Sequence, residues 1–166
     1  GGVGIAFLKQ YHQAGLMGTI PMVGAEPTLD IATLQAVGEI ALGLNIGAKW
    51  NADFDNAESK DFVAAFQKRY NRVPSVYAGQ GWDTAQALAA ALKVVGGDDV
   101  TKLSAELRKA DFKSIRGAFK FGPNQHPVQD WYHVQPVKNA DGSFSLKTAS
   151  KILTDHGDAF AKDCKL

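Results

Sequence analysis

Two side chains in this sequence occupy positions where a small molecule could be bound. Glu26 stands in a loop directly after residues 16–23, an apolar run that predicts a short buried strand. Open α/β sheets bind ligands beyond the carboxyl ends of their strands, where a carboxylate can accept hydrogen bonds from an ammonium group. Tyr77 falls in the first turn of a long predicted helix, where its ring or hydroxyl can contact a ligand. The alternatives are a solvated loop glutamate and a tyrosine that only packs.

Motifs typical of enzymes are missing from the sequence. The tripeptide Gly79-Gln80-Gly81 lacks the third glycine of a dinucleotide-binding loop and follows no predicted strand. Cys164 lies near the end of the chain, where a free thiol or a disulfide to a segment outside this sequence is expected. We therefore predict no enzymatic activity, no metal and no cofactor. The four histidines are scattered without metal-ligand spacing, at His12, His126, His133 and His156.

Composition indicates a globular α/β protein rather than a disordered, membrane-spanning or nucleic-acid-binding one. The 166 residues are 45% hydrophobic and 21% charged, and the formal net charge is +1. That charge balance provides no basic face for nucleic acid. No apolar run approaches the roughly 20 residues that a membrane-spanning helix needs. No signal peptide is recognisable, although a mature exported protein would also lack one.

The first third of the chain alternates helical and strand patterns. Apolar residues recur at helical spacing over residues 5–11, and Asp30 can cap a second, short helix. Residues 16–23 and 40–46 predict buried strands, and polar residues 51–56 predict a linker. A helix that leads into a parallel strand normally follows an earlier strand, so we expect the chain to belong to a longer polypeptide.

The remainder predicts helices followed by strands. Asn56 can cap one helix, Pro74-Ser75 begins a longer one that ends at Gly96-Gly97, and Thr101 can cap a third. The apolar period then changes from 3.6 to 2. This alternation marks strands over residues 118–121, 132–137 and 144–146.

An ordered set of short segments spread over the whole chain carries a family resemblance. The segments are GGVGIAFLKQ (residues 1–10), Gly24-Ala25-Glu26, residues 38–43, residues 62–66 with Arg69-Tyr70, residues 77–83, residues 117–124 and residues 128–132. Together they resemble the C-terminal half of type I periplasmic solute-binding proteins of ABC importers. The branch is the leucine-binding-protein-like one, whose members bind branched-chain amino acids or aromatic acids.

The resemblance implies a fold of two α/β/α lobes joined by hinge strands, of which this chain would form only the C-terminal half. Residues 1–48 would then belong to the second lobe and residues 49–129 to the first. Residues 130–166 would return to the second lobe and form the C-terminal tail. Hinge crossings would lie near residues 47–50 and 130–132.

The resemblance also implies a function, partners and a location. The chain would capture a small amino acid or aromatic acid by lobe closure and deliver it to a membrane permease of an ABC importer in the periplasm. The N-terminal half of the same protein would complete the site, with no nucleic acid involved. The alternative is a ligand-sensing domain of a receptor or regulator with the same fold.

The ligand-binding residues implied by the resemblance contain conflicting clues about the ligand. Glu26 matches the acid that receives an amino group, and Tyr77 matches an aromatic residue that covers the ligand. Val3 stands where some amino-acid binders have tyrosine, and a carboxylate at Glu26 would repel an aromatic acid. The ligand therefore stays open between the two classes. The full predicted set is Glu26, Tyr77, Ala25, Val3 and Gly2.

Overall fold

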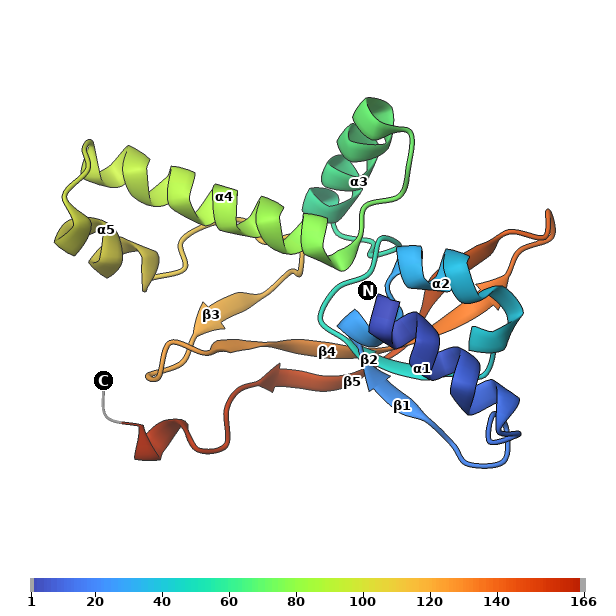
Figure 1. Cartoon of the computed structure of the whole chain (residues 1–166). Helices are drawn as coiled ribbons and strands as arrows, with labels where there is room; N and C mark the ends of the chain where they lie inside the picture. The colour runs from blue at the N-terminus through green and yellow to red at the C-terminus, as the bar shows by residue number, and fades with distance from the viewer. Residues whose placement is uncertain (1, 165–166) are drawn as a thin grey trace.

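The computed structural model describes residues 2–164, which form a five-stranded sheet with helices packed against it (Figure 1). The strands follow the order β1-β2-β4-β3, with β5 paired to β4. The β1–β2 pair is parallel and the other pairs are antiparallel. This mixed architecture confirms the predicted α/β class. The strands are β1 (Val23–Ala25), β2 (Asn45–Ala48), β3 (Phe119–Phe121), β4 (Pro127–Lys138) and β5 (Phe144–His156).

The long strand β4 connects two parts of the sheet. Its residues 127–129 pair with β3, and its residues 132–134 pair with β2. Strand β5 runs antiparallel along β4, from Phe144 opposite Lys138 to His156 opposite Gln129. The register between β4 and β5 shifts three times between Gln129 and Val134. Such irregularities bend a strand locally, so β4 is irregular where its partner changes from β3 to β2.

One hydrophobic cluster lies under the helices at the start of the chain. These are α1 (Gly2–Gln13), the 3-10 turn η1 (Glu26–Leu29), α2 (Ile31–Val37) and the 3-10 turn η2 (Gly38–Ala41). The predicted cap at Asp30 is confirmed, because its Oδ1 accepts a 2.8 Å hydrogen bond from the Thr33 N–H. The buried members of this cluster are Leu8, Leu29, Leu34, Val37, Ala41, Leu44, Ile46, Ala48 and Val134.

A second cluster lies beneath α3 (Ala57–Tyr70) and α4 (Val76–Val95), which is followed by α5 (Val100–Leu107). The predicted caps at Asn56 and Ser75 are confirmed: Asn56 accepts from Ser59 N–H at 2.8 Å, and Ser75 accepts from Ala78 N–H at 3.3 Å. Gly96 ends α4 in the left-handed conformation with φ of 67°, as predicted. The buried members of the second cluster are Trp50, Phe54, Phe62 and Ile115.

The glycine at position 79 allows α4 to approach the second cluster closely. A Cβ atom there would lie 3.0 Å from Ile115 Cδ1 and 3.1 Å from Trp50 Cε3. The Trp50 indole N–H donates a 2.9 Å hydrogen bond to Ser59 Oγ on α3, which fixes the ring between the two helices. The Gly79-Gln80-Gly81 tripeptide therefore serves helix packing at its first residue.

Several predicted elements differ from the observed ones. Residues 16–22 form turns instead of a strand, because Gly15 and Gly18 adopt positive φ of 71° and 80°, and β1 begins only at Val23. The predicted strand over residues 40–46 starts late: η2 covers Ile40 and Ala41, and Gly43 has φ of 92° before β2 begins at Asn45. The cap of α5 is Asp99 rather than Thr101, since Asp99 Oδ1 accepts from Lys102 N–H at 3.1 Å.

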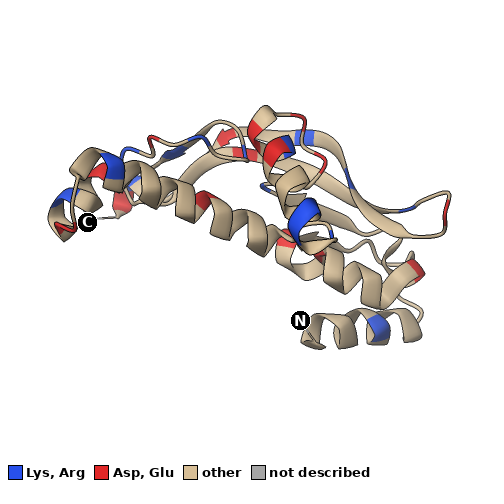
Figure 2. Cartoon of the chain, turned by 90° about the horizontal axis from the view of Figure 1, so that it is seen from above, with Lys and Arg blue, Asp and Glu red and all other residues tan. Residues whose placement is uncertain are grey.

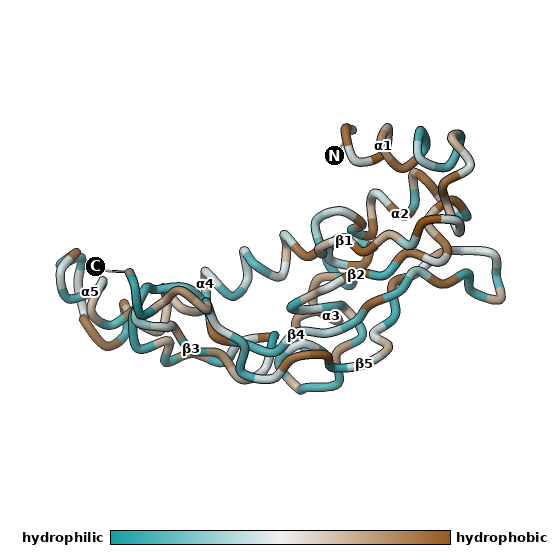
Figure 3. Tube along the Cα trace, turned by 90° about the horizontal axis from the view of Figure 1, so that it is seen from below, coloured by the Kyte–Doolittle hydropathy of each residue, from teal (hydrophilic) through white to brown (hydrophobic). Residues whose placement is uncertain are grey.

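The exterior carries mixed charges, with acidic and basic residues distributed over the helices and strands (Figure 2). Hydrophobic and hydrophilic residues are interspersed along the elements of the chain, as the brown and teal parts of the tube show (Figure 3). The apolar residues that recur along α4 are not all buried: Trp82, Leu88 and Leu92 are exposed, whereas Asp83 on the same helix is buried. Over residues 2–164, no helix combines the length and apolarity needed to cross a membrane.

Candidate functional site

The candidate site is centred on Glu26, which is the first residue after β1. Its neighbour in space is Lys49, which is the first residue after β2. Strands β1 and β2 are adjacent and parallel, with Ala25 opposite Gly47, so their carboxyl ends meet at one edge of the sheet. The Glu26 carboxylate accepts the Lys49 backbone N–H at 2.7 Å and lies 3.2 Å from the Lys49 ammonium nitrogen. Parallel pairing therefore positions an acid and a cation at the edge where such sheets bind ligands.

Helix α4 also contacts the Glu26 carboxylate. Gln80 on α4 donates a hydrogen bond from Nε2 to Glu26 Oε1 at 3.3 Å. Glu26 is only 5% exposed, and burial of an ionised carboxylate requires such partners. An ionised carboxylate has about four acceptor positions, and three donors are bound here. One acceptor position remains for a further donor.

The other predicted site residues are exposed, unlike Glu26. Tyr77 is 56% exposed and lies three residues before Gln80 on α4, which places it about one turn from the residue that contacts Glu26. Ala25 is exposed and adjoins Glu26 in the chain. Gly2 and Val3 begin α1, and Val3 is 87% exposed.

The start of α1 lies beside η1, the turn that begins with Glu26. A Cβ atom added at Gly4 would lie 3.8 Å from the Thr28 carbonyl oxygen in η1. The beginning of α1 thus lies beside the turn that starts with Glu26, and α4 contacts Glu26 through Gln80.

Sequence reasoning missed Lys49 and Gln80 as partners of Glu26. The signal for Lys49 was its place after the second parallel strand, but the predicted strand ended at residue 46, two positions too early. The signal for Gln80 was its spacing of three residues from Tyr77. Both contacts join residues far apart in the chain, 23 and 54 positions from Glu26.

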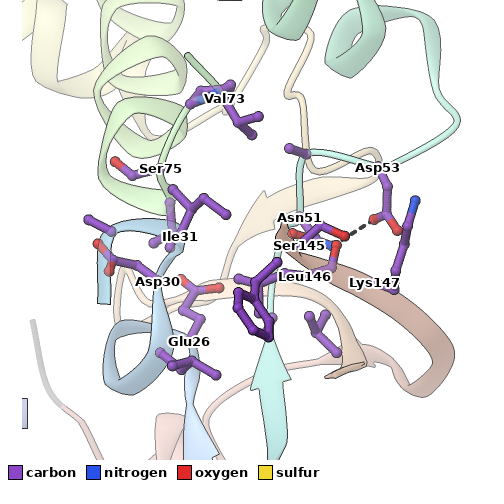
Figure 4. A pocket seen from close by; sticks show the side chains of 18 of the residues that line it. Glu26, Asp30, Ile31, Asn51, Asp53, Val73, Ser75, Ser145, Leu146 and Lys147 are labelled. Atoms are coloured by element: carbon purple, nitrogen blue, oxygen red, sulfur yellow. Dashed lines mark hydrogen bonds between the residues drawn. The ribbon is translucent and has the colours of Figure 1, made fainter. Parts of the chain in front are cut away.

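A hollow of about 670 Å³ borders the same carboxylate, as Figure 4 shows. Leu29, Ile46 and Val134 line it from the first cluster, and Trp50 and Val63 line it from the second. The hollow therefore lies between the two clusters, where the chain crosses from one to the other.

Residues 51–56, predicted as a linker, are attached to β5 beside this hollow. Asp53 accepts the Thr148 backbone N–H at 2.9 Å and the Thr148 hydroxyl at 2.6 Å. Asn51 Nδ2 donates to Asp53 at 2.7 Å and to the Leu146 carbonyl at 3.1 Å. The polar side chains of Asn51 and Asp53 thus connect this segment to β5.

The irregular part of β4 holds a second ionic group. Asp130 accepts the Asp155 N–H at 3.0 Å and pairs with the Lys151 ammonium, which lowers the pKa of the Asp130 carboxyl. Burial raises the pKa of the neighbouring Tyr132 hydroxyl, which donates to Asp130 at 3.4 Å. These bonds join β4 to β5 at the register shifts.

The helix that carries Tyr77 and Gln80 is anchored to β4 through Asp83. This carboxylate accepts the Ser114 hydroxyl at 2.6 Å, the Ile115 N–H at 3.0 Å and the Arg116 Nε–H at 2.8 Å. Arg116 in turn donates to Gln129 Oε1 at 2.9 Å. The position of α4 relative to β4 is therefore set by buried polar contacts.

The described residues offer little for metal binding. Within residues 2–164, no three side chains of His, Cys, Asp or Glu are grouped as metal ligands would be. His133 instead forms a 2.8 Å hydrogen bond with Asn45 across β2 and β4. Cys164 is a free, exposed thiol. The arrangement is suited to noncovalent binding through a buried, hydrogen-bonded acid.

Comparison with known protein families identifies the relatives of this chain. The sequence model described as "Periplasmic binding protein" matches residues 1–142. The chain belongs to this periplasmic binding protein family. That membership confirms the family predicted from the ordered segments. Among proteins of curated function, none matches this sequence.

Solved structures show the same fold in ABC transporter solute-binding proteins. One from R. palustris, in complex with benzoate, is 34% identical with a TM-score of 0.85 and covers 100% of this chain. One from Sphaerobacter thermophilus is 29% identical with a TM-score of 0.83 and covers 93%. A leucine-binding protein from Thermotoga maritima, at 22% identity and a TM-score of 0.74 over 90% of this chain, shows the fold alone.

The match extends over less than half of each of those proteins. The aligned portions are 44% of the R. palustris chain, 43% of the Sphaerobacter chain and 41% of the Thermotoga chain. The present chain therefore has the type I periplasmic binding protein fold over about half of that fold's length.

Proposed function

We propose that this chain forms part of the substrate-binding component of an ABC importer and contributes to the binding of a small amino acid or aromatic acid. The observation that carries the proposal is the buried Glu26 carboxylate, on which a loop after β1, a loop after β2 and helix α4 converge. Family membership and the benzoate-bound relative support it. The ligand-binding residues proposed are Glu26, Tyr77, Ala25, Val3 and Gly2.

The binding step proposed is closure of two lobes. The two hydrophobic clusters and the hollow between them support a division into residues 1–48, 49–129 and 130–166, whose outermost residues 1, 165 and 166 lie outside the described residues. The register shifts in β4 support a crossing near residues 130–132, and the end of β2 supports another near residues 47–50. Irregular pairing near residues 130–132 would let the lobes rotate without unfolding.

The N-terminal half of the same protein is the proposed partner that completes the site. Leu88 and Leu92 are exposed and lie one turn apart on α4, where they form an apolar surface that such a half could cover. The shares of 41–44% of the solved relatives leave room for such a half. A membrane permease would be the transient partner, in the periplasm, and binding would involve no cofactor and no turnover.

The test uses the full-length protein that contains this chain. Isothermal titration with benzoate, 4-hydroxybenzoate, leucine and isoleucine should detect binding of at least one compound. Glu26→Ala should weaken binding of leucine, isoleucine or 4-hydroxybenzoate at least about tenfold, because a hydrogen bond from the ligand's ammonium or hydroxyl to a charged acceptor is lost. Tyr77→Ala should weaken binding of whichever compound binds by a similar factor, because contact with the tyrosine ring is lost.

A matched control keeps the test specific. Tyr70→Ala removes another exposed tyrosine, on α3, and should leave the affinity unchanged. Equal affinities for wild type, Glu26→Ala and Tyr77→Ala would remove the site assignment. Absence of any binding to the four compounds would contradict the proposed function.

A further inference from the structure

The Glu26 carboxylate already has an ammonium group bound to it, supplied by this chain. The Lys49 Nζ lies 3.2 Å from Glu26 Oε1, while the Lys49 backbone N–H binds the other oxygen, Oε2, at 2.7 Å. Lysine 49 therefore contacts both oxygens of the acid. The β1–β2 pairing holds the Lys49 backbone beside Glu26, so the Lys49 side chain starts close to the Glu26 carboxylate.

The side chains of Glu26 and Lys49 differ in how far a ligand can reach them. The Glu26 side chain is 6% exposed and the Lys49 side chain 25% exposed. The Lys49 ammonium also lies 5.9 Å from the centre of the Trp131 ring, so the cation is located between an acid and an aromatic face. A ligand that reaches Glu26 from the side of Lys49, the more exposed member of the pair, meets the Lys49 ammonium as well.

This pairing changes which ligands the site can accept. A ligand with a free amine would bring a second cation to a carboxylate that already holds one, and like charges at such distances repel. A ligand carboxylate meets instead a pair of zero net charge with ammonium donors still available, since a lysine ammonium has three. The conflict between an acid at position 26 and an acidic ligand therefore disappears.

We infer that Lys49 is an internal counter-ion of Glu26 that excludes amino acids and selects an aromatic carboxylate without an amino group. The inference rests on the proposed function and chooses between its two ligand classes. The exposed Tyr77 ring, about one turn from Gln80, offers a surface for the ligand's ring. The remaining acceptor position on Glu26 would accept a ligand hydroxyl.

The test compares ligands that differ only by the amino group. The full-length protein is titrated with benzoate and with two matched pairs, 3-phenylpropionate against phenylalanine and 4-methylpentanoate against leucine. In wild type the acid without the amine should bind at least about tenfold more tightly than its amino acid. In Lys49→Met this ratio should fall at least about tenfold, because the carboxylate is then free to receive a ligand ammonium.

Two control variants separate charge from folding. Lys49→Arg keeps the positive charge and should keep the preference for the acid without the amine. Lys68→Met removes an exposed lysine on α3 and should leave all affinities unchanged. The melting temperature of each variant shows whether it is folded.

The outcomes are distinguishable. A wild-type protein that prefers phenylalanine or leucine overturns the inference but leaves solute binding intact. An unchanged ratio in folded Lys49→Met overturns the role of Lys49. If Lys49→Met does not fold, the ratio of affinities in wild type and in Lys49→Arg still tests the inference, because both should prefer the acid without the amine. Binding of none of the probes overturns both the inference and the proposed function.

Discussion

The region around Asp83 and the region around Glu26 each contain a buried carboxylate paired with a cation of the chain, but they are built differently. Asp83 is 2% exposed, and its three donors lie at 2.6–3.0 Å. Its cation, Arg116, also bonds Gln129 and lies 4.2 Å from the centre of the Phe119 ring. Every partner of this acid is itself held in place.

The Glu26 region has the same number of donors with less constraint. Only the Lys49 backbone N–H is short, at 2.7 Å, while the Lys49 ammonium and the Gln80 amide lie at 3.2 and 3.3 Å. Both of the longer contacts come from flexible side chains. The Asp83 group is therefore tightly constrained and fixes α4 in place, whereas two of the three contacts to Glu26 are longer and come from flexible side chains.

The largest effect is expected when the buried hydrogen bonds of Asp83 are removed. Asp83→Ala leaves the Arg116 guanidinium, 14% exposed, without its carboxylate, together with two further donors. We expect the free energy of unfolding to fall by about 3–5 kcal/mol, the usual cost of removing one partner of a buried ion pair. Urea denaturation measures it, with exposed Asp61→Ala as the control. A loss below about 1 kcal/mol would show that Asp83 is not the anchor of α4.

The next largest effect is expected from a substitution that disturbs the packing of α4 and leaves Asp83 and Glu26 unchanged. Gly79→Ala inserts a Cβ atom 3.0 Å from Ile115 and 3.1 Å from Trp50, and such overpacking costs about 1–3 kcal/mol of stability. Gly81→Ala lies two residues further along, where a Cβ meets nothing within 4 Å, and should raise stability by about 0.5–1 kcal/mol. Thermal unfolding measures both. The same sign for both variants would contradict the close packing at position 79.

A smaller effect is expected at the Glu26 group. Glu26→Gln keeps an acceptor for the Lys49 N–H, and the released Lys49 ammonium can reach water. Stability should fall by about 1 kcal/mol, well below the effect of Asp83→Ala. Urea denaturation of both variants under one condition makes the comparison. A loss at Glu26 equal to that at Asp83 would mean that both acids are structural anchors.

The smallest effect concerns the pair of Asp130 and Lys151, which extends the comparison to a lysine-bound acid near the surface. The hydrogen bond from Lys151 lowers the pKa of Asp130. Its stabilising contribution is therefore present above the unfolded pKa of about 3.9 and is lost as pH falls through the lower folded value. The stability difference between wild type and Asp130→Asn should be constant near neutral pH and shrink in acid. A pH-independent difference in urea denaturation would contradict the pairing.

The helix boundaries that the sequence predicted correctly depend on local chemistry. The caps at Asp30, Asn56 and Ser75 each bind an N–H three residues ahead, so the signal and its partner lie within one turn. The end of α4 at Gly96 is equally local. The strand predicted over residues 16–23 was wrong because apolar Met17 packs against the first cluster from a turn. The predicted burial of this run was also wrong, because Ile20 and Val23 are 52% and 76% exposed.

The sequence by itself determined the α/β class, the family and the identity of Glu26 and Tyr77 as candidate ligand contacts, because these depend on ordered segments and short-range spacing. Only the tertiary structure decided that Lys49 and Gln80 bind Glu26, since parallel pairing of β1 with β2 and the anchoring of α4 unite residues 23 and 54 positions apart. The charge environment of a buried carboxylate is set by such long-range neighbours. For that reason the counter-ion role inferred for Lys49, which bears on the choice between the two ligand classes, could be proposed only from the fold.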